Sequence, residues 1–579
     1  MKKVKSGKRA DSGATSHHGS GWVSRSAALL AGVLMGTEAW GASLPGQPGA
    51  GTLMQEVQPA PVQEPSGNAT GLTIEAGKRK KGLDDSVAFD VKQIVFEGNR
   101  VVDTATLHDL VRDEEGTMLT LKKLQGLADR VTGYYRDHGY PLSRAVIPVQ
   151  SLEGGVVRIQ VIEAKYGKVL LDNTSRAKSW VLQELLYPLK GGEAVQEGDL
   201  DRALLLMSDV PGVESSAALK PGDQVGTSDL DVMVKPGAWA SGSLTADNYG
   251  NDYTGNGRLG GAVSVYELLG LGDQLSANAL TSGPGMNYGR VGYDLLANGS
   301  GTRVGASLSD LRYVLGGSLA GLNGSGTAAI TSLWARQPLL RSRSVNLYGQ
   351  AEYDYKRVSD QTDPGGVLNL TNRHLDNGML SLNGDERDGW MRGGVGLMSA
   401  SWTQGRVNFD NMAALSVDTA GARESGTFGK WNGSLTRLQD VGSERAQVYL
   451  SISGQWAQKN LDPVEKLVVG GPYSVRAYDM GVLAADSGVL ETVEGRYKVN
   501  DHWQAVVFGD RENVSINANP YLAGPNGATL SGAGLGLNWS GDGAWNGRTY
   551  VATRVGAVPT QLAGSPASTL IWAELSRTF

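Results

Sequence analysis

The 579-residue chain contains no cysteine, which excludes a disulfide scaffold, thiolate metal sites and a cysteine nucleophile. Its six histidines are scattered, and only His17 and His18 stand at a metal-ligand spacing. The sequence also lacks a Gly-x-Ser-x-Gly elbow and a Walker Gly-Lys-Ser/Thr motif. Because neither a nucleophile–base pair nor a nucleotide site can be found in it, we predict a protein that is not an enzyme and that needs no cofactor or metal.

No run of apolar residues approaches the ~20 that a transmembrane helix requires. The run from Ala27 to Met35 follows a basic leader and precedes the small residues Ala39 and Gly41, which is typical of an export signal. We therefore predict that residues 1–41 are a signal peptide. An exported chain without a transmembrane helix can be soluble, or it can cross a membrane as a closed barrel, because only these arrangements leave no backbone group unpaired.

The chain also has no excess of positive charge, since its formal net charge is −6. Residues 1–41 carry six Lys/Arg and two acids, a net of +4, so their removal leaves about −10. Such an acidic protein is a poor partner for nucleic acid. The basic run Lys78–Lys81 is predicted to be a solvated linker segment. Gly255–Gly260 matches the dinucleotide fingerprint but leads into a strand, so we do not predict phosphate binding there.

Apolar and polar residues alternate from about Ala238 to Phe579. In one stretch, Val448, Leu450 and Ile452 fall on one parity while the residues between them are polar. Successive side chains of a strand point to opposite faces, so each stretch predicts a strand with one apolar and one polar side. Glycine is abundant, at 81 residues, which fits strand ends and tight turns.

We count sixteen such strands, and an even number closes an antiparallel barrel with both ends on one side of the membrane. Residues 238–579 are thus predicted to form a transmembrane β-barrel with lipid outside and water inside. Its C-terminal aromatic residue, Phe579, fits the signal for barrel insertion. Some aromatic residues are predicted to face lipid or the membrane interface: Trp402, Trp431, Trp456 and Trp572. The predicted strand starts are 241, 255, 273, 286, 301, 325, 343, 373, 392, 427, 444, 488, 501, 530, 546 and 569.

The segments before the barrel have a different pattern. Residues 42–86 are rich in Pro, Gly and Gln and are predicted to be a linker, with a weakly signalled helix near 52–57 that could act as a plug. Residues 87–164 show the order strand, helix, helix, strand, strand, and residues 165–237 repeat it. The predicted fold class is therefore mainly β, with two α+β modules before a sixteen-stranded barrel.

Several motifs in these modules resemble those of the two-partner secretion transporters, which are outer-membrane pores that export filamentous adhesins and haemolysins. Gly139–Ala145 and Gly155–Ile159 are similar to the family's first POTRA (polypeptide-transport-associated) domain. Asp209–Val213 and Leu219–Gly222 are similar to its second. The family usually has glycine where this chain has Ala164.

The most specific motif is Val475-Arg476-Ala477-Tyr478, which resembles the superfamily's lumen-loop tetrad Val-Arg-Gly-Tyr. Phe508-Gly509-Asp510 resembles the motif of a later strand, in which the family has glycine where this chain has Glu512. By alternation alone, Phe508 and Asp510 point into the lumen. The resemblance implies that Arg476 pairs with Asp510 and holds the loop 459–487 inside the barrel. The alternative is that Arg476 is a solvated residue of an extracellular loop.

Two further charged residues, Glu494 and Arg496, share the lumen parity of the preceding strand and are predicted to support this pair.

The resemblance implies export of a large partner exoprotein, of adhesin or haemolysin type, across the bacterial outer membrane. The periplasmic POTRA pair would capture the partner's unfolded N-terminal secretion domain, and folding outside the cell would drive export without nucleotide. Outer-membrane lipid and the barrel-assembly machinery are the other expected partners, and a monomer is expected.

The alternatives are a barrel-assembly insertase of the same superfamily, or a plain porin or enzyme. An insertase would usually carry more modules, and a porin would not need any.

Overall fold

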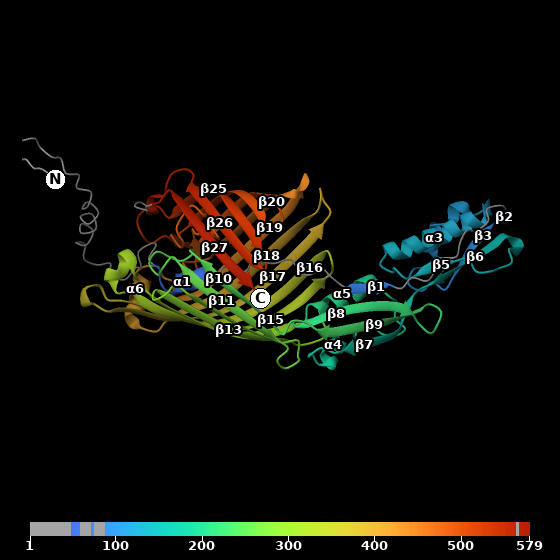
Figure 1. Ribbon diagram of the computed structural model, residues 1–579, viewed down its shortest axis with the longest axis horizontal. Helices are drawn as coiled ribbons and strands as arrows, with labels where there is room; N and C mark the ends of the chain where they lie inside the picture. The colour runs from blue at the N-terminus through green and yellow to red at the C-terminus, as the bar shows by residue number, and fades with distance from the viewer. Residues whose placement is uncertain (1–47, 58–70, 75–86, 563–566) are drawn as a thin grey trace, which may run out of the picture. The chain divides into compact units, whose positions relative to one another are not determined.

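The computed structural model describes residues 48–57, 71–74, 87–562 and 567–579 (Figure 1). The predicted signal peptide, residues 1–41, and the basic run Lys78–Lys81 lie outside the described residues. Within the described ranges, no helix combines the length and the hydropathy needed to cross a membrane.

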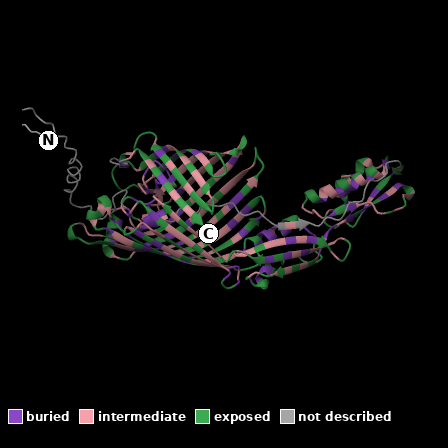
Figure 2. Ribbon diagram, in the orientation of Figure 1, coloured by how far each residue is buried: buried purple, intermediate pink, exposed green. Residues whose placement is uncertain are grey.

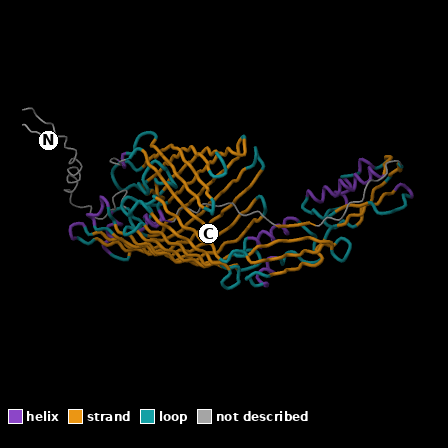
Figure 3. Tube along the Cα trace, in the orientation of Figure 1, coloured by secondary structure: helices purple, strands orange, loops and turns teal. Residues whose placement is uncertain are grey.

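Sixteen antiparallel strands close into a barrel, whose wall is the large group of strands in Figures 1 and 3. The predicted barrel is confirmed. Every strand begins within four residues of its predicted start, and the largest difference is at β17, which begins at Asn369 rather than at 373. The strands are β10 (Ala240–Asp247), β11 (Arg258–Tyr266), β12 (Gln274–Thr281), β13 (Met286–Leu296), β14 (Arg303–Val314), β15 (Ser325–Arg341), β16 (Val345–Thr362), β17 (Asn369–Asp388), β18 (Gly394–Phe409), β19 (Gly426–Val441), β20 (Ser443–Ala457), β23 (Ser487–Lys498), β24 (Trp503–Ser515), β25 (Gly527–Gly541), β26 (Trp545–Arg554) and β27 (Thr569–Thr578).

The barrel closes where β27 pairs with β10, and the last residue of the chain completes this seam. The backbone groups of Gly242 and Phe579 exchange two hydrogen bonds, at 2.9 and 3.0 Å. A Cβ at Gly242 would lie 2.5 Å from the Phe579 ring, so only glycine leaves room for the ring here. The terminal aromatic residue thus packs directly on the first strand.

Side chains of the wall alternate between exposed apolar and buried polar residues, which gives the banded strands of Figure 2. On β20, Leu450 and Ile452 are each more than 40 % exposed, whereas Gln455 is 3 % exposed. Trp431 and Trp456, which pair across β19 and β20, are both about half exposed, as predicted for the outer face. The same prediction is wrong for Trp572, which is 5 % exposed and lies inside the barrel.

The first module packs one long helix against a three-stranded sheet in the order β3-β6-β5. Leu124, Leu127, Ala128 and Val131 recur at helical spacing on α3 and are buried against the sheet. The single strand predicted from Phe89 onwards is divided in two, and its first part pairs with β4, which the sequence did not predict. The elements are β2 (Ala88–Val91), β3 (Gln93–Glu97), α2 (Thr104–Asp109), β4 (Thr117–Thr120), α3 (Leu121–Asp137), β5 (Arg144–Val146) and β6 (Val156–Ile162).

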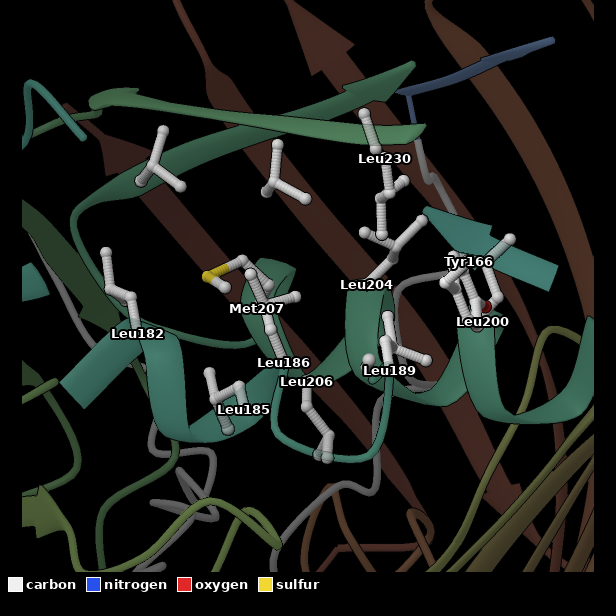
Figure 4. Close-up of a cluster of buried hydrophobic side chains, with 14 of the residues drawn as sticks. Tyr166, Leu182, Leu185, Leu186, Leu189, Leu200, Leu204, Leu206, Met207 and Leu230 are labelled. Atoms are coloured by element: carbon white, nitrogen blue, oxygen red, sulfur yellow. The ribbon is translucent and has the colours of Figure 1, made fainter. Parts of the chain in front are cut away.

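The second module has the same order of elements, with a sheet β8-β9-β7 that a further short strand, β1 (Gly71–Ile74), extends beyond β8. Leu182, Leu185, Leu204 and Met207 come from its two helices and pack beneath this sheet (Figure 4). Its remaining elements are β7 (Lys165–Asn173), α4 (Ser179–Leu185), α5 (Glu197–Ser208), β8 (Val213–Pro221) and β9 (Thr227–Pro236).

Several short elements complete the described chain. Two helices belong to neither module: α1 (Ala50–Val57) and α6 (Met412–Ala420). The pair β21 (Leu467–Val469) and β22 (Leu483–Ala485) lies in the long connection between β20 and β23. The 3-10 helices are η1 (Arg112–Glu114), η2 (Glu153–Gly155), η3 (Gly317–Leu322), η4 (Pro364–Gly366), η5 (Pro463–Glu465) and η6 (Thr560–Leu562).

Candidate functional site: a loop and a helix inside the barrel

The connection between β20 and β23, residues 458–486, folds into the barrel. Val475, Ala477 and Tyr478 near its tip are at most 1 % exposed. They form one buried cluster with Phe508, whose parity on β24 is opposite to that of the exposed Val507. The tip therefore lies among lumen-facing side chains, and the structure does not place Arg476 in a solvated extracellular loop.

Arg476 makes the central contact between the tip and the wall. Its Nε and Nη2 donate to the two carboxylate oxygens of Asp510, at 2.8 and 2.7 Å. Its Nη1 donates to Glu494 Oε1 at 2.7 Å. Arg496 donates from Nε to the other oxygen of Glu494 at 2.8 Å. The structure thus brings together all four charged residues that the sequence analysis selected, and their charges balance.

Aromatic side chains enclose the same guanidinium group. Its central carbon lies 3.5 Å from the centre of the Phe508 ring and 5.1 Å from that of Tyr550. Trp572 donates from Nε1 to the backbone carbonyl oxygen of Arg476 at 2.7 Å. The rings exclude water from the ion pairs and add cation–π attraction, so each polar contact is stronger than it would be in solvent.

The burial of these charges makes every partner necessary. The side chain of Asp510 is fully buried, and that of Arg476 is 5 % exposed. Removing one member of such a pair leaves the other buried and uncompensated, which costs about 3–5 kcal/mol. The two parallel bonds to Asp510 also require the planar fork of arginine, which a lysine cannot reproduce.

Ala477 stands where the family tetrad has glycine, and the wall opposite it compensates. A Cβ on Gly532 of β25 would lie 2.6 Å from the Cβ of Ala477. Non-bonded carbon atoms do not approach so closely without strain. The methyl group at 477 is therefore accommodated because residue 532 has no side chain.

Glu512, the other departure from the family pattern, makes a contact of its own with the loop. Its carboxylate accepts a hydrogen bond from Ser474 Oγ, and that oxygen in turn accepts one from the Gly470 N–H at 3.0 Å. Glu512 is 1 % exposed. The substitution thus adds a buried link between β24 and the tip.

A second group of ion pairs holds the base of the loop, the part that contains η5. Glu465 accepts a hydrogen bond from Lys356 at 2.7 Å and pairs with Lys430 at 2.8 Å. Asp462 pairs with Arg373. Their barrel partners come from β16, β17 and β19, whereas those of the tip come from β23 and β24. Both ends of the loop are therefore held by buried charges.

Helix α1 packs on this base inside the lumen. Leu53 and Met54 are fully buried among apolar lumen-facing side chains of β13 to β16. Gln55 Nε2 donates to the carbonyl oxygen of Val464 at 2.6 Å. A Cβ on Gly51 would lie 2.5 Å from the Val464 nitrogen, so glycine allows the helix to touch the loop backbone. The weakly signalled helix of the linker is thus an occupant of the barrel.

Sequence reasoning missed Trp572, Gly532 and the ion pairs of the loop base. Alternation on β27 could have found Trp572, because Ile571 and Leu575 share the exposed parity and Glu574 shares that of the tryptophan. No local signal identifies Gly532, since its role depends on a residue 55 positions away. In the part of the chain that the structure describes, no group of three His, Cys, Asp or Glu side chains could hold a metal ion.

Comparison with known proteins gives two family matches. Residues 226–537 match the family described as haemolysin secretion/activation protein ShlB/FhaC/HecB, and residues 89–164 match the ShlB-type POTRA domain. The heme/hemopexin transporter protein HuxB of Haemophilus influenzae is 25 % identical over 472 residues, which cover 80 % of this chain and 82 % of that protein.

Other similar proteins are outer membrane transporters. The transporter CdiB of Escherichia coli O6:K15:H31 is 24 % identical over 426 residues, 72 % of this chain and 70 % of that protein. The solved structure of CdiB from Escherichia coli superposes with a TM-score of 0.68 at 21 % identity, covering 87 % of this chain and 93 % of that chain. CdiB from Acinetobacter baumannii gives 0.62 at 18 % identity, with 91 % and 96 % covered. These two structures support the fold.

We expect Arg476→Ala to release the loop tip, because Asp510 and Glu494 would remain buried without a counter-charge, at a cost of about 3–5 kcal/mol. Limited proteolysis in lipid nanodiscs should then cut between residues 470 and 482, where the wild type resists cleavage. Arg511→Ala, which removes an exposed arginine next to Asp510, is the matched control and should resist like the wild type. Equal resistance of the two variants would contradict the role of Arg476.

We expect Gly532→Ala to disturb the tip through its contact with Ala477, and Ala477→Gly to restore it in the double variant. The free energies of unfolding of the four proteins, measured by denaturant titration in nanodiscs, form a double-mutant cycle. The cycle should give a coupling of about 1–3 kcal/mol, the usual cost of overpacking. Strictly additive effects would show that the two residues do not meet.

Proposed function

The chain belongs to the haemolysin secretion/activation protein family and is a two-partner secretion transporter of the outer membrane, and we propose how it moves its cargo. Its POTRA region lies in the periplasm and its barrel spans the membrane. An extended N-terminal segment of the partner exoprotein binds to the periplasmic modules first. The segment then enters the barrel, passes through the lumen and folds on the outer side.

The observation that supports this route is the way the lumen is filled. The loop tip and base are held by several buried ion pairs. Helix α1 is held mainly by apolar side chains, with a neutral hydrogen bond from Gln55 to Val464 and one charge-assisted bond from the Ala50 N–H to Asp360 at 2.7 Å. Its one charged side chain, Glu56, accepts a hydrogen bond from the amide of Asn251 at 3.4 Å. We infer that α1 is the plug of the resting pore and that it leaves before the loop does.

We propose that no catalytic step takes part. The sequence offers neither a nucleotide motif nor a nucleophile–base pair, and the family is one of pores. Folding of the partner outside the cell then makes its export unidirectional, because a folded chain cannot return through the lumen. We propose a large exoprotein of adhesin or haemolysin type as the cargo, and the family description names haemolysin.

The other partners follow from the barrel. Its exposed Leu, Val and Trp side chains meet outer-membrane lipid, and Phe579 at the closing seam serves the barrel-assembly machinery during insertion. The closed β10–β27 seam leaves no strand edge of the barrel unpaired, so a monomer suffices. The family match to the secretion branch disfavours an insertase.

Deletion of residues 90–234 should abolish export, because it removes both modules and leaves the barrel without a receptor for its cargo. The amount of partner protein in the culture medium measures export. Heat-modifiable migration in SDS gels should show that the shortened protein still forms a barrel in the outer membrane. Export at the wild-type level by such a barrel would contradict the proposed route.

Deletion of residues 48–57 should raise the mean single-channel conductance in planar bilayers, because it removes α1 from the lumen. Leu53→Asp, which places a charge at a fully buried position of α1, should give frequent open bursts. Met412→Asp on α6, where the side chain is 75 % exposed, is the control and should keep the wild-type conductance. Unchanged conductance after the deletion would place the constriction elsewhere.

A further inference from the structure

The strand β1 comes from the segment between the plug helix and the first module, yet it pairs with the second module. It lies parallel to β8, and its four residues pair in order with Ser216, Ala217, Ala218 and Leu219. Leu72 packs against the hydrophobic core of that module. The sheet order is β1-β8-β9-β7, so without β1 the strand β8 would be an open edge.

The edge that β1 covers is the longer of two equivalent edges. In the first module the corresponding strand is β5, with three residues, whereas β8 has nine. A short edge is a poor template for another strand, and a long one offers a row of backbone groups that await a partner. Extended peptides bind to such edges by strand addition. Of these two equivalent edges, that of β8 in the second module therefore fits an extended peptide better.

The present occupant of this edge is weakly attached. It forms only four residue pairs, in the parallel arrangement, which is slightly less stable per residue than the antiparallel one. Its covalent connection to α1 compensates, because a short tether gives an effective concentration in the millimolar range. The tether consists of the 13 residues 58–70 and can span at most about 50 Å.

We propose that the β8 edge is the docking site for an extended segment of the exported partner and that β1 is a built-in competitor for it. When the partner's segment replaces β1, the linker is released and α1 loses its periplasmic attachment. This inference rests on the proposed function and adds to it the docking edge and the element that the cargo displaces.

The pairing of β1 also indicates which kind of segment fits the β8 edge. It runs parallel to β8 and covers at least four residues. The position that pairs with Ala217 takes an apolar side chain of leucine size, because Leu72 packs on the core there. The positions that pair with Ser216 and Ala218 face the opposite side by alternation and can be polar. A charge at the position that pairs with Ala217 would face this apolar core and is excluded.

Binding of a peptide in trans tests the edge independently of export. The probe is a fluorescent peptide of residues 68–77, NATGLTIEAG, and the receptor is the full chain in nanodiscs. The variant Leu72→Asp should free the edge and bind the probe at least tenfold more tightly than the wild type does. Leu170→Asp, at a half-exposed position on β7 of the same module, should bind it as weakly as the wild type. Equal affinity of the wild type and Leu72→Asp would overturn the proposal.

A reversible cross-link tests displacement during export. Because the natural chain has no cysteine, Thr73→Cys with Ala218→Cys creates a single pair at positions that lie side by side. Oxidation should lower secretion of the partner at least tenfold, and reduction should restore it. The control pair Glu214→Cys with Lys235→Cys joins β8 to β9 and should leave secretion unchanged.

Either of two results would overturn the proposal: normal secretion by the oxidised Thr73/Ala218 pair, or failure of that pair to cross-link when the control pair does. Failure of the proposed function gives a different pattern, since the barrel without residues 90–234 would then still secrete its partner.

Discussion

The arrangement of the lumen depends on one buried guanidinium group. Arg476 meets Asp510 through two parallel bonds and Glu494 through a third, and Phe508 covers its face. A hydrated barrel of sixteen strands is wide enough to be a pore. The loop can stay inside it only because the charge that it carries is fully matched by the wall. The same low polarity that makes the matched cluster strong makes each unmatched state costly, so the loop has one stable position and no gradual series of others.

The base of the loop repeats this principle on other strands of the barrel, where Glu465 pairs with Lys356 and Lys430. A loop anchored at its tip and its base forms a rigid surface across the lumen, and α1 packs on this surface. The helix itself is held mainly by apolar contacts, with one charge-assisted hydrogen bond from the Ala50 N–H to Asp360, and Gly51 lets it approach the backbone of Val464. Moving the loop out of the lumen thus costs more free energy than moving α1. This difference suits a pore that must be closed at rest and open during export.

Alternation in the sequence predicted the barrel, because each strand had to present apolar side chains to lipid. It also placed Asp510 and Glu494 in the lumen, and the resemblance to the family supplied Arg476 as their partner. Contacts between distant segments could not be predicted in this way. Gly532 makes room for Ala477, and β1 pairs with a module that it does not adjoin in sequence. The ion pairs of the loop base join the loop to strands that are distant in the chain. Trp572 is predicted at the lipid face or the membrane interface because tryptophan is enriched there, although its own parity points inward.

Hydrogen exchange of the intact protein in lipid nanodiscs tests the central claim most directly, because amide protection reports whether the loop is held inside the barrel. Peptides that cover residues 470–486 should exchange as slowly as those of β24, since their backbone groups are buried among the ion pairs and rings. Peptides from the exposed loop at 521–525 supply the fast reference. Exchange of residues 470–486 at the rate of that exposed loop would show that Arg476 does not hold the loop in the lumen.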